Sequence, residues 1–478
     1  MYTLRNALFC CLLTAMMLCS VVPPLWCAEE YVVTLDQFVK EKAPFDDPRP
    51  VFKNLSFQKV IPPEDYAKVT YDIEAMKKAW SEVVGFKAPD VVGTVAPEIK
   101  PGTYTYQDKE KYPFKDLMWP VLYERFNPGG PPFFGNFPEI KVIPTRQYYW
   151  ALPVAEATKK NAGQTKLDDQ GYYLPDTYVS GYPFPQPAGD RKAEQIMYNW
   201  EKRNYGGEDF FIIGTTTGFR KDLSIDHEGA YNMYVLRLNG RVMQQPYGWY
   251  DERARQSREN KAFVVRHLAP RDMYGTAVSL VSYIDPDHLD SWMVYVNVLR
   301  RVRKMSASDT QDPVGQWDII YEDQQAYNQK LSPNRYPYKK QVMAEGEYLV
   351  PFATLDGAPY ISSQGREMRD FEFERRPTYV IGLTQLDSNY IYSKRILYFD
   401  KETFMIYHGE YYDQKGRLYR TLDPIQYFNP EMGIFFEYYW FCWDHLDMHS
   451  TYGRNYNFHA PWVGREQTDL RSLIKTAK

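Results

Sequence analysis

The chain has 478 residues, of which 57 are basic and 61 acidic, for a net charge of −4, and 17% of its residues are aromatic. This near-neutral balance, without a block of basic residues, argues against nucleic acid as a partner. The 42 tyrosines, 26 phenylalanines and 11 tryptophans favour a large β-sheet, because aromatic rings fit pleated, half-buried surfaces. The rings could cover the outer face of such a sheet or line a cavity.

Residues 1–28 have the features of a secretory signal peptide. Arg5 precedes an apolar run from Ala7 to Val22, and the small residue Ala28 stands directly before two glutamates. Three fates of this segment stay open: simple cleavage after Ala28, lipid attachment at Cys27, or retention as an anchor. The segment holds four of the five cysteines, so its removal would leave Cys442 without a disulfide partner. The remaining chain is expected in the periplasm of a Gram-negative-type envelope, either free or associated with the outer membrane.

Residues 29–140 predict a Pro-rich N-terminal arm. One helix is expected after Pro62 and Pro63. Its apolar residues recur at helical spacing and are Val69, Ile73, Met76 and Trp80. The many Pro and Gly residues of 95–140 indicate an extended segment that wraps over the main body, because Pro cannot donate hydrogen bonds to a sheet.

Residues 141–478 predict one β domain. Strands are expected at 209–218, 230–238, 276–284, 291–304, 346–352, 378–386, 391–399, 404–412 and 433–443. Their short spacing favours antiparallel pairing. A helix is expected to begin with Asp190 as its cap and to end at Gly206. The predicted fold is therefore mainly β, of the α+β type: a large curved antiparallel sheet with a few packed helices and an extended arm.

Several segments in this order resemble a family of exported bacterial proteins, the domain-of-unknown-function 1329 family. The segments are Gly181–Pro187, Tyr198–Asn199, Arg203–Gly207 and Glu345–Pro351. The resemblance covers roughly residues 140–425. It implies an exported protein, and it implies resistance–nodulation–division type exporters as partners, since members are thought to work beside them.

A looser resemblance is to outer-membrane lipoprotein-sorting proteins of the LolA/LolB type. It rests on Val296–Lys304, Ser306–Asp309 and Gly409–Gly416. This resemblance implies a strongly bent antiparallel sheet, an open and incomplete barrel plugged by helices, with an apolar interior. It also implies a carrier of acyl chains, although a shared fold does not establish a shared function.

The strand expected at 291–304 is apolar on both faces, which favours either a core strand buried twice or a strand with one face toward a ligand cavity. The same two interpretations apply to the apolar strand at 210–213 and to the aromatic strand ending at Trp440. The segment 181–187 is interpreted either as a rigid entry to the following helix or as the edge of a lid. The candidates for a cavity lining are Trp292, Val294, Val296, Val298, Phe210, Ile212, Tyr182, Phe184 and Trp440.

Four basic residues follow the apolar part of this strand: Arg300, Arg301, Arg303 and Lys304. One interpretation is a solvated strand end that pairs with Asp309 and Asp312. The other is a patch for an anionic head group or a partner protein, because guanidinium groups bind phosphate and carboxylate in pairs of hydrogen bonds.

One cluster has metal-ligand residue types: His445, Asp447 and His449. The spacing would place both histidines on one face, but it lacks the glutamate of a zinc-peptidase motif. Surface or hydrogen-bonded histidines are the alternative. The sequence has no nucleophile elbow and no phosphate-binding glycine loop, so an enzyme, a catalytic residue and a cofactor are not expected.

These observations predict a periplasmic carrier or chaperone that binds a lipid- or terpenoid-like molecule in a β-lined cavity and serves an export or outer-membrane pathway. Two alternatives stay open. One is a structural or interaction subunit of a membrane exporter complex, whose aromatic surfaces are interfaces. The other is a periplasmic metal-dependent hydrolase that uses the region of His445 and His449.

Overall fold

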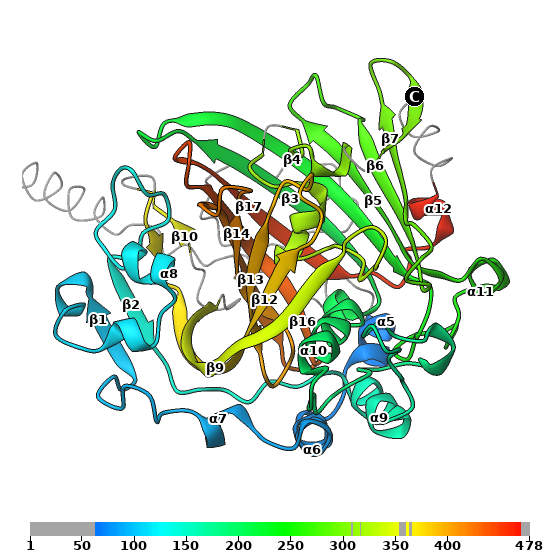
Figure 1. Ribbon diagram of the computed structural model, residues 1–478, viewed down its shortest axis with the longest axis horizontal. Coiled ribbons are helices and arrows are strands. Elements are labelled where there is room, and N and C mark those ends of the chain that lie inside the picture. Colours follow the sequence, from blue (N-terminus) through cyan, green and yellow to red (C-terminus); the bar gives the residue numbers. More distant parts are fainter. Residues whose placement is uncertain (1–62, 307–308, 316, 353–359, 363–365, 470–478) are drawn as a thin grey trace, which may run out of the picture.

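The computed structural model describes residues 63–306, 309–315, 317–352, 360–362 and 366–469 (Figure 1). The predicted signal peptide and the first part of the predicted arm lie outside these residues. The strands are β1 (Gly102–Thr105), β2 (Glu139–Val142), β3 (Asp209–Phe219), β4 (Ile225–Arg237), β5 (Glu259–Ala269), β6 (Ala277–Tyr283), β7 (Ser291–Val296), β8 (Arg301–Lys304), β9 (Tyr338–Phe352), β10 (Tyr360–Ile361), β11 (Met368–Arg369), β12 (Glu372–Gln385), β13 (Lys394–Asp400), β14 (Ile406–Tyr412), β15 (Leu418–Asn429), β16 (Ile434–Asp444) and β17 (His449–His459).

The helices are short. The α-helices are α5 (Pro63–Tyr66), α6 (Ile73–Val84), α7 (Ala88–Val91), α8 (Pro120–Arg125), α9 (Leu152–Asn161), α10 (Lys192–Glu201), α11 (Glu252–Ser257) and α12 (Arg465–Thr468). The 3-10 helices are η1 (Ala67–Val69), η2 (Tyr106–Asp108), η3 (Phe114–Asp116), η4 (Pro175–Thr177), η5 (Tyr205–Gly207), η6 (Asp309–Gln311) and η7 (Tyr321–Ala326). Within the described residues, no helix is long and apolar enough to cross a membrane.

One sheet of 15 strands dominates the described residues, in the order β1-β2-β12-β13-β14-β15-β16-β17-β3-β4-β5-β6-β7-β8, with β9 also paired to β12. All of its pairs are antiparallel except β2 with β12. The end strands β1 and β8 do not pair with each other in the part of the chain described, so the sheet stays open. The prediction of a large, unclosed, mostly antiparallel sheet is confirmed.

The sheet bends strongly. The register shifts within several strand pairs, for example between Val380 and Ile381 and between Ile425 and Gln426. Such bulges increase local twist and bend a strand. In Figure 1 the bent sheet has α5, α6, α9 and α10 gathered at its lower end. Every residue of β3 and β16 is buried, so both faces of these central strands are covered.

The helix predicted in the arm is α6. Asp72 caps it by accepting a 2.7 Å hydrogen bond from the Ala75 amide, and Gly85, with φ of 89°, ends it. Its buried residues include Met76 and Trp80, as the helical spacing predicts. The segment 63–140 also contains the shorter helices α5, α7 and α8, and its apolar residues belong to the same core as those of the sheet.

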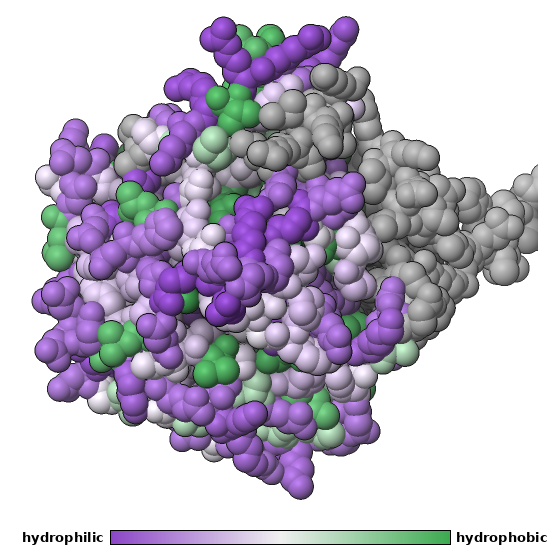
Figure 2. All heavy atoms as spheres, turned by 90° about the vertical axis from the view of Figure 1, so that its right-hand side faces the viewer, coloured by the Kyte–Doolittle hydropathy of each residue, from purple (hydrophilic) through white to green (hydrophobic). Residues whose placement is uncertain are grey.

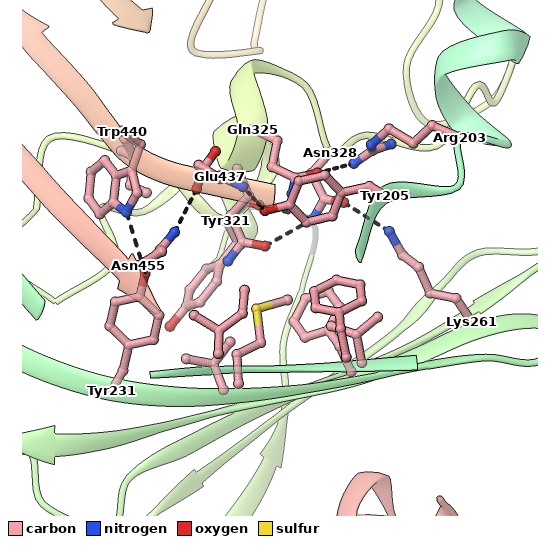
Figure 3. Close-up of a pocket in the computed structure, with 18 of the residues that line it drawn as sticks. Arg203, Tyr205, Tyr231, Lys261, Tyr321, Gln325, Asn328, Glu437, Trp440 and Asn455 are labelled. Carbon is pink, nitrogen blue, oxygen red and sulfur yellow. Dashed lines mark hydrogen bonds between the residues drawn. The ribbon is translucent and has the colours of Figure 1, made fainter. Parts of the chain in front are cut away.

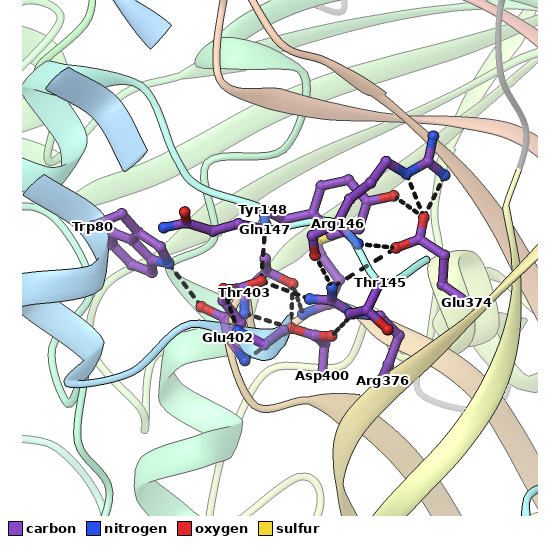
Figure 4. Close-up of polar contacts among 12 residues, drawn as sticks. Trp80, Thr145, Arg146, Gln147, Tyr148, Glu374, Arg376, Asp400, Glu402 and Thr403 are labelled. Atoms are coloured by element: carbon purple, nitrogen blue, oxygen red, sulfur yellow. Dashed lines mark hydrogen bonds and ion pairs between the residues drawn. The ribbon is translucent and has the colours of Figure 1, made fainter. Parts of the chain in front are cut away.

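A network of buried ion pairs on the sheet also contacts this N-terminal segment (Figure 4). Arg376 on β12 lies 2.7 Å from carboxylate oxygens of both Asp400 and Glu402. Glu402 also accepts a 2.9 Å hydrogen bond from the Tyr148 amide, and its carbonyl accepts one of 2.7 Å from the Trp80 indole. A buried charge is tolerated only when it is paired and hydrogen-bonded, and each group here satisfies another.

Two local predictions are wrong. The segment 291–304 is not one strand but the hairpin β7–β8, whose turn includes Arg300 with φ of 51°. A strand that reverses there brings Val296 opposite Arg301. The helix α10 is present, but its N-cap residue is Arg191 rather than Asp190, and no side chain caps it. It also ends at Glu201 rather than at Gly206, which belongs to the separate 3-10 helix η5.

Candidate functional site

A cavity of about 120 Å³ lies between the sheet and the segment 317–328 (Figure 3). Strands β15, β16, β17, β3, β4 and β5 all contribute lining residues, and η7 in the covering segment packs on β14 and β15. In Figure 3, Tyr321, Gln325 and Asn328 of this segment face the strands across the cavity. The covering segment thus encloses the pocket against one face of the sheet.

The wall on β3, β4 and β5 is apolar. Residues two apart in a strand point to the same face, and the register of these strands places the lining residues side by side. They form two cross-strand rows, Phe210, Val235 and Phe263 in one and Ile212, Met233 and Val265 in the other. An apolar molecule in contact with this wall would be removed from water, which is favourable in proportion to the area buried.

Two cations lie at the rim of this wall, Arg203 and Lys261 (Figure 3). The Lys261 ammonium donates a 3.2 Å hydrogen bond to Asn328, and the Arg203 guanidinium lies 3.7 Å from the centre of the Trp200 ring. Neither forms a salt bridge with a described residue. Burial, and then the charge of Arg203, lowers the pKa of Lys261 to about 7. The cavity is also lined by two further cations and two carboxylates, Lys202, Arg237, Glu201 and Glu208. Arg203 and Lys261 are therefore cations of a mixed rim, and both lack a direct salt bridge to a described residue.

A buried carboxyl group, Glu437, lies on another side of the cavity. One of its oxygens accepts a 2.8 Å hydrogen bond from Asn455, and the other has no partner among the described residues. Asn455 in turn accepts a 2.6 Å hydrogen bond from the Tyr231 hydroxyl (Figure 3). Burial raises the pKa of Glu437 to about 8. At neutral pH this group is therefore mostly protonated and adds little negative charge to the cavity.

Three of the residues expected to line a cavity do so: Phe210, Ile212 and Trp440. Trp292 is buried beside the cavity, with its ring 5.6 Å from that of Phe263, which does line it. The strand predicted for the apolar run at 210–213 places the first two on one face, because residues two apart in a strand point to the same side.

The other expected lining residues lie elsewhere. Val294 and Val296 are half-buried on β7, and Val298 is 76% exposed because it lies in the turn of the β7–β8 hairpin. Tyr182 is buried in the core against α6, and Phe184 is half-buried against the same core.

The sequence did not identify Lys261, Arg203, Met233 or Glu437 as cavity residues. The alternation of Lys261, Phe263 and Val265 was a usable signal for β5. Arg203 and Lys261 come from different elements and meet only through the fold.

The basic patch predicted at 300–304 surrounds the exposed tip of the β7–β8 hairpin. All four basic residues lack a salt bridge to any described residue, and at the tip Val298 and Leu299 are 76% and 60% exposed. The predicted pairing partner Asp309 instead accepts a 2.6 Å hydrogen bond from the Ser306 amide. The tip therefore combines apolar and basic side chains that all face solvent.

The three candidate metal ligands near residue 445 separate in the structure. His445 shares a 2.9 Å hydrogen bond with Thr421, and burial lowers the pKa of His445 to about 4. Asp447 lies in the turn before β17. His449 is directed elsewhere, with its Nδ1 2.7 Å from Asp318.

The comparisons with known proteins give one family. The model of the DUF1329 family, described as a protein of unknown function, matches residues 124–470. No curated protein matches the chain.

Similar solved structures include proteins of the two groups that the sequence resembles. A DUF1329 family protein from Desulfovibrio piger has 15% identity and a TM-score of 0.40, over 56% of this chain and 91% of that one. A putative outer membrane lipoprotein-sorting protein domain from Vibrio parahaemolyticus has 16% identity and a TM-score of 0.42, over 59% and 97%. A LolA superfamily protein from Nitrosomonas europaea has 14% identity and a TM-score of 0.36, over 58% and 97%.

Proposed function

Since this chain belongs to the DUF1329 family of proteins of unknown function, its function has to be inferred from its own site, and we propose that it is a periplasmic carrier of a small amphiphile. The observation that carries the proposal is the cavity, with one apolar wall and with Arg203 and Lys261 at its rim, neither of which forms a salt bridge with a described residue. Such a site needs a ligand with an apolar body and an anionic end.

The size of the cavity limits the ligand. A cavity of about 150 Å³ accepts a molecule as large as benzene, and this one measures about 120 Å³. A ring or a branched group of about six carbons would fill it, and each methylene buried would contribute about 0.8 kcal/mol. Of a longer lipid, only one end of the chain would fit in the cavity.

The ligand's polar end is proposed to be a carboxylate or a similar anion. Arg203 and Lys261 repel each other, which is one cause of the lowered pKa of Lys261. An anion between them would remove this repulsion and favour the protonated lysine. Glu437, mostly protonated at neutral pH, would not oppose such an anion.

The β7–β8 hairpin tip is proposed to dock on an anionic membrane surface. Val298 and Leu299 would enter the interface while the neighbouring basic residues, Arg300, Arg301, Arg303 and Lys304, bind lipid head groups. Each basic residue near such a surface contributes about 1 kcal/mol. The carrier could then collect or release its ligand at the membrane, and an exporter of the resistance–nodulation–division type is a proposed partner through family kinship.

A structural subunit would need a broad apolar interface. On the face shown in Figure 2, the apolar side chains of the described residues stand in small separate groups among hydrophilic ones. The described residues of this face therefore offer no broad apolar interface.

Calorimetric titration with octanoate and with octanol, its neutral counterpart, tests the proposal. Met233→Trp would fill the cavity and is expected to abolish binding of both, whereas Met343→Trp, at an exposed position on β9, would change neither. Lys261→Met is expected to weaken the binding of octanoate and to leave the binding of octanol unchanged. Equal octanoate binding by Met233→Trp and the wild type would refute the site.

A further inference from the structure

A second cluster of chemically active side chains lies outside the cavity, where β4 and β17 begin. Asp226, His227 and His449 each offer an atom that could bind a metal ion, and these atoms all lie within 4.8 Å of one another. Strand β3 runs between the two histidines, since Gly218 of β3 pairs with His227 and Phe219 of β3 pairs with Ser450, the residue after His449. The sheet itself therefore brings together residues more than 200 positions apart in sequence.

Gly218 makes room for this arrangement. A Cβ atom at this position would lie 2.2 Å from the His227 ring, which is far closer than non-bonded carbon atoms approach. The His227 imidazole therefore lies across β3 and stacks against that of His449, with ring centres 5.9 Å apart and an interplanar angle of 12°. Any larger residue at position 218 would displace the ring.

Asp318 fixes the orientation of His449. The Nδ1 of His449 lies 2.7 Å from one Asp318 oxygen, and the Thr451 hydroxyl donates a 2.6 Å hydrogen bond to the same carboxylate. Nδ1 is then the protonated nitrogen, which leaves Nε2 with its lone pair free, 3.6 Å from Asp226. A carboxylate that holds the far nitrogen of a histidine is the usual outer partner of a metal-binding imidazole.

His227 provides an independent observation. Its side chain is only 8% exposed, and its Nδ1 lies 3.2 Å from Asp226. Its other ring nitrogen, Nε2, is buried and has no hydrogen-bond partner among the described residues. A buried polar atom without a partner is costly, and bound metal or a metal-bound water would remove that cost.

We propose that Asp226, His227 and His449 bind one zinc ion, with Asp318 orienting His449 and the remaining position open to water or a ligand. Two imidazoles and one carboxylate form a donor set that suits zinc, and three protein ligands leave its fourth position open. Asp226 is at present paired with Arg220, whose side chain is 57% exposed and can move away into solvent.

A proton is the competing occupant. The hydrogen bond to Asp318, and then the charges of Asp318 and Asp226, raise the pKa of His449. A protonated His449 would form a simple ion pair between the two carboxylates and could not bind metal. The two states can be distinguished because a metal ion produces a spectroscopic signal and a proton does not.

The test is a Zn²⁺ titration of the exported full-length protein against a chromophoric chelator, repeated with Co²⁺ to record the absorption of a tetrahedral site. One ion per chain is expected. Affinity should fall by on the order of 100-fold or more in His227→Ala and in Asp226→Asn, and by on the order of 10-fold in Asp318→Asn. His288→Ala, which removes an exposed histidine elsewhere, should bind as the wild type does.

The Asp226→Asn variant separates a loss of metal binding from a folding defect. Asp226 is exposed, so this substitution should leave the fold intact. Two results would overturn the proposal. One is a folded wild-type protein that binds no Zn²⁺ at mildly alkaline pH, which would leave the protonated ion pair as the state of His449. The other is stoichiometric binding that persists unchanged in both Asp226→Asn and His227→Ala.

Discussion

The two titratable groups of the cavity should give opposite pH dependences of stability, which single substitutions can separate. Lys261→Met removes the buried amine and keeps the length of its stem, while Glu437→Gln removes the buried acid and keeps its shape. Both side chains line the cavity. The quantity to measure is the free energy of unfolding of each variant minus that of the wild type, because other titrating groups cancel in this difference.

The direction of the Lys261 effect follows from its pKa, which is about 7 in the folded protein against an ordinary value of 10.5. Between these values the unfolded chain binds more protons than the folded one, so stability rises with pH. From about pH 6.5 to about pH 9 the rise amounts to about 2.5 kcal/mol. Lys261→Met loses this rise, so its stability relative to the wild type should fall by that amount.

Glu437 should have the opposite effect on the pH dependence of stability. Its pKa is about 8 in the folded protein against an ordinary value of 4.5, so the folded protein binds more protons and stability falls as pH rises. Over the same interval the loss amounts to about 2 kcal/mol. The stability of Glu437→Gln relative to the wild type should therefore increase by that amount, and the two effects nearly cancel in the wild type.

Urea unfolding followed by tryptophan fluorescence at the two pH values measures these differences. Lys339→Met, at an exposed position on β9, is the matched control for the loss of one positive charge. If the stability of Lys261→Met relative to the wild type stayed constant with pH, Lys261 would not be a buried, desolvated amine. The electrostatic basis of the proposed anion site would then be wrong.

Three further results are expected. Arg376→Met leaves Asp400 and Glu402 buried without their cation and should cost about 3–5 kcal/mol in urea unfolding; a loss below about 1 kcal/mol would show that this network does not hold the N-terminal segment. The double substitution Val298→Asp with Leu299→Asp should reduce sedimentation with vesicles containing anionic lipid while Tm stays unchanged, because both residues are exposed; undiminished sedimentation would exclude the hairpin tip. Gly218→Ala should lower both Tm and Zn²⁺ affinity through its clash with the His227 ring, and normal values of both would contradict the packing described there.

Most of the sheet could be predicted from sequence because its strands are apolar and bounded by turn residues. The strands at 209–218, 378–386 and 433–443 correspond to β3, β12 and β16. β17 was missed because its sequence is polar, yet ten of its eleven residues are buried. Its polar side chains are satisfied across the sheet, as when Asn455 bonds Glu437 and Tyr231, and local sequence does not report such partners.

Only the part of the site that lies on one face of one strand could be predicted from the sequence. Because residues two apart in a strand share a face, Phe210 and Ile212 could be placed together, but the covering segment 317–328 meets the sheet only through tertiary contacts. The error at 291–304 has the same origin. The turn contains neither Gly nor Pro, and the apolar residues Val298 and Leu299 lie within it, so the positive φ of Arg300 had no local signal.

The central claim, that the cavity holds a small anionic amphiphile, is tested most directly by purifying the protein gently from its native host, extracting it with solvent and identifying the extract by mass spectrometry. The Met233→Trp variant is treated in parallel. We expect one compound with an apolar body and an anionic end, near one per chain in the wild type and absent from the variant. Recovery of the same compound from Met233→Trp, or an empty wild-type protein that also fails to bind octanoate, would contradict the account.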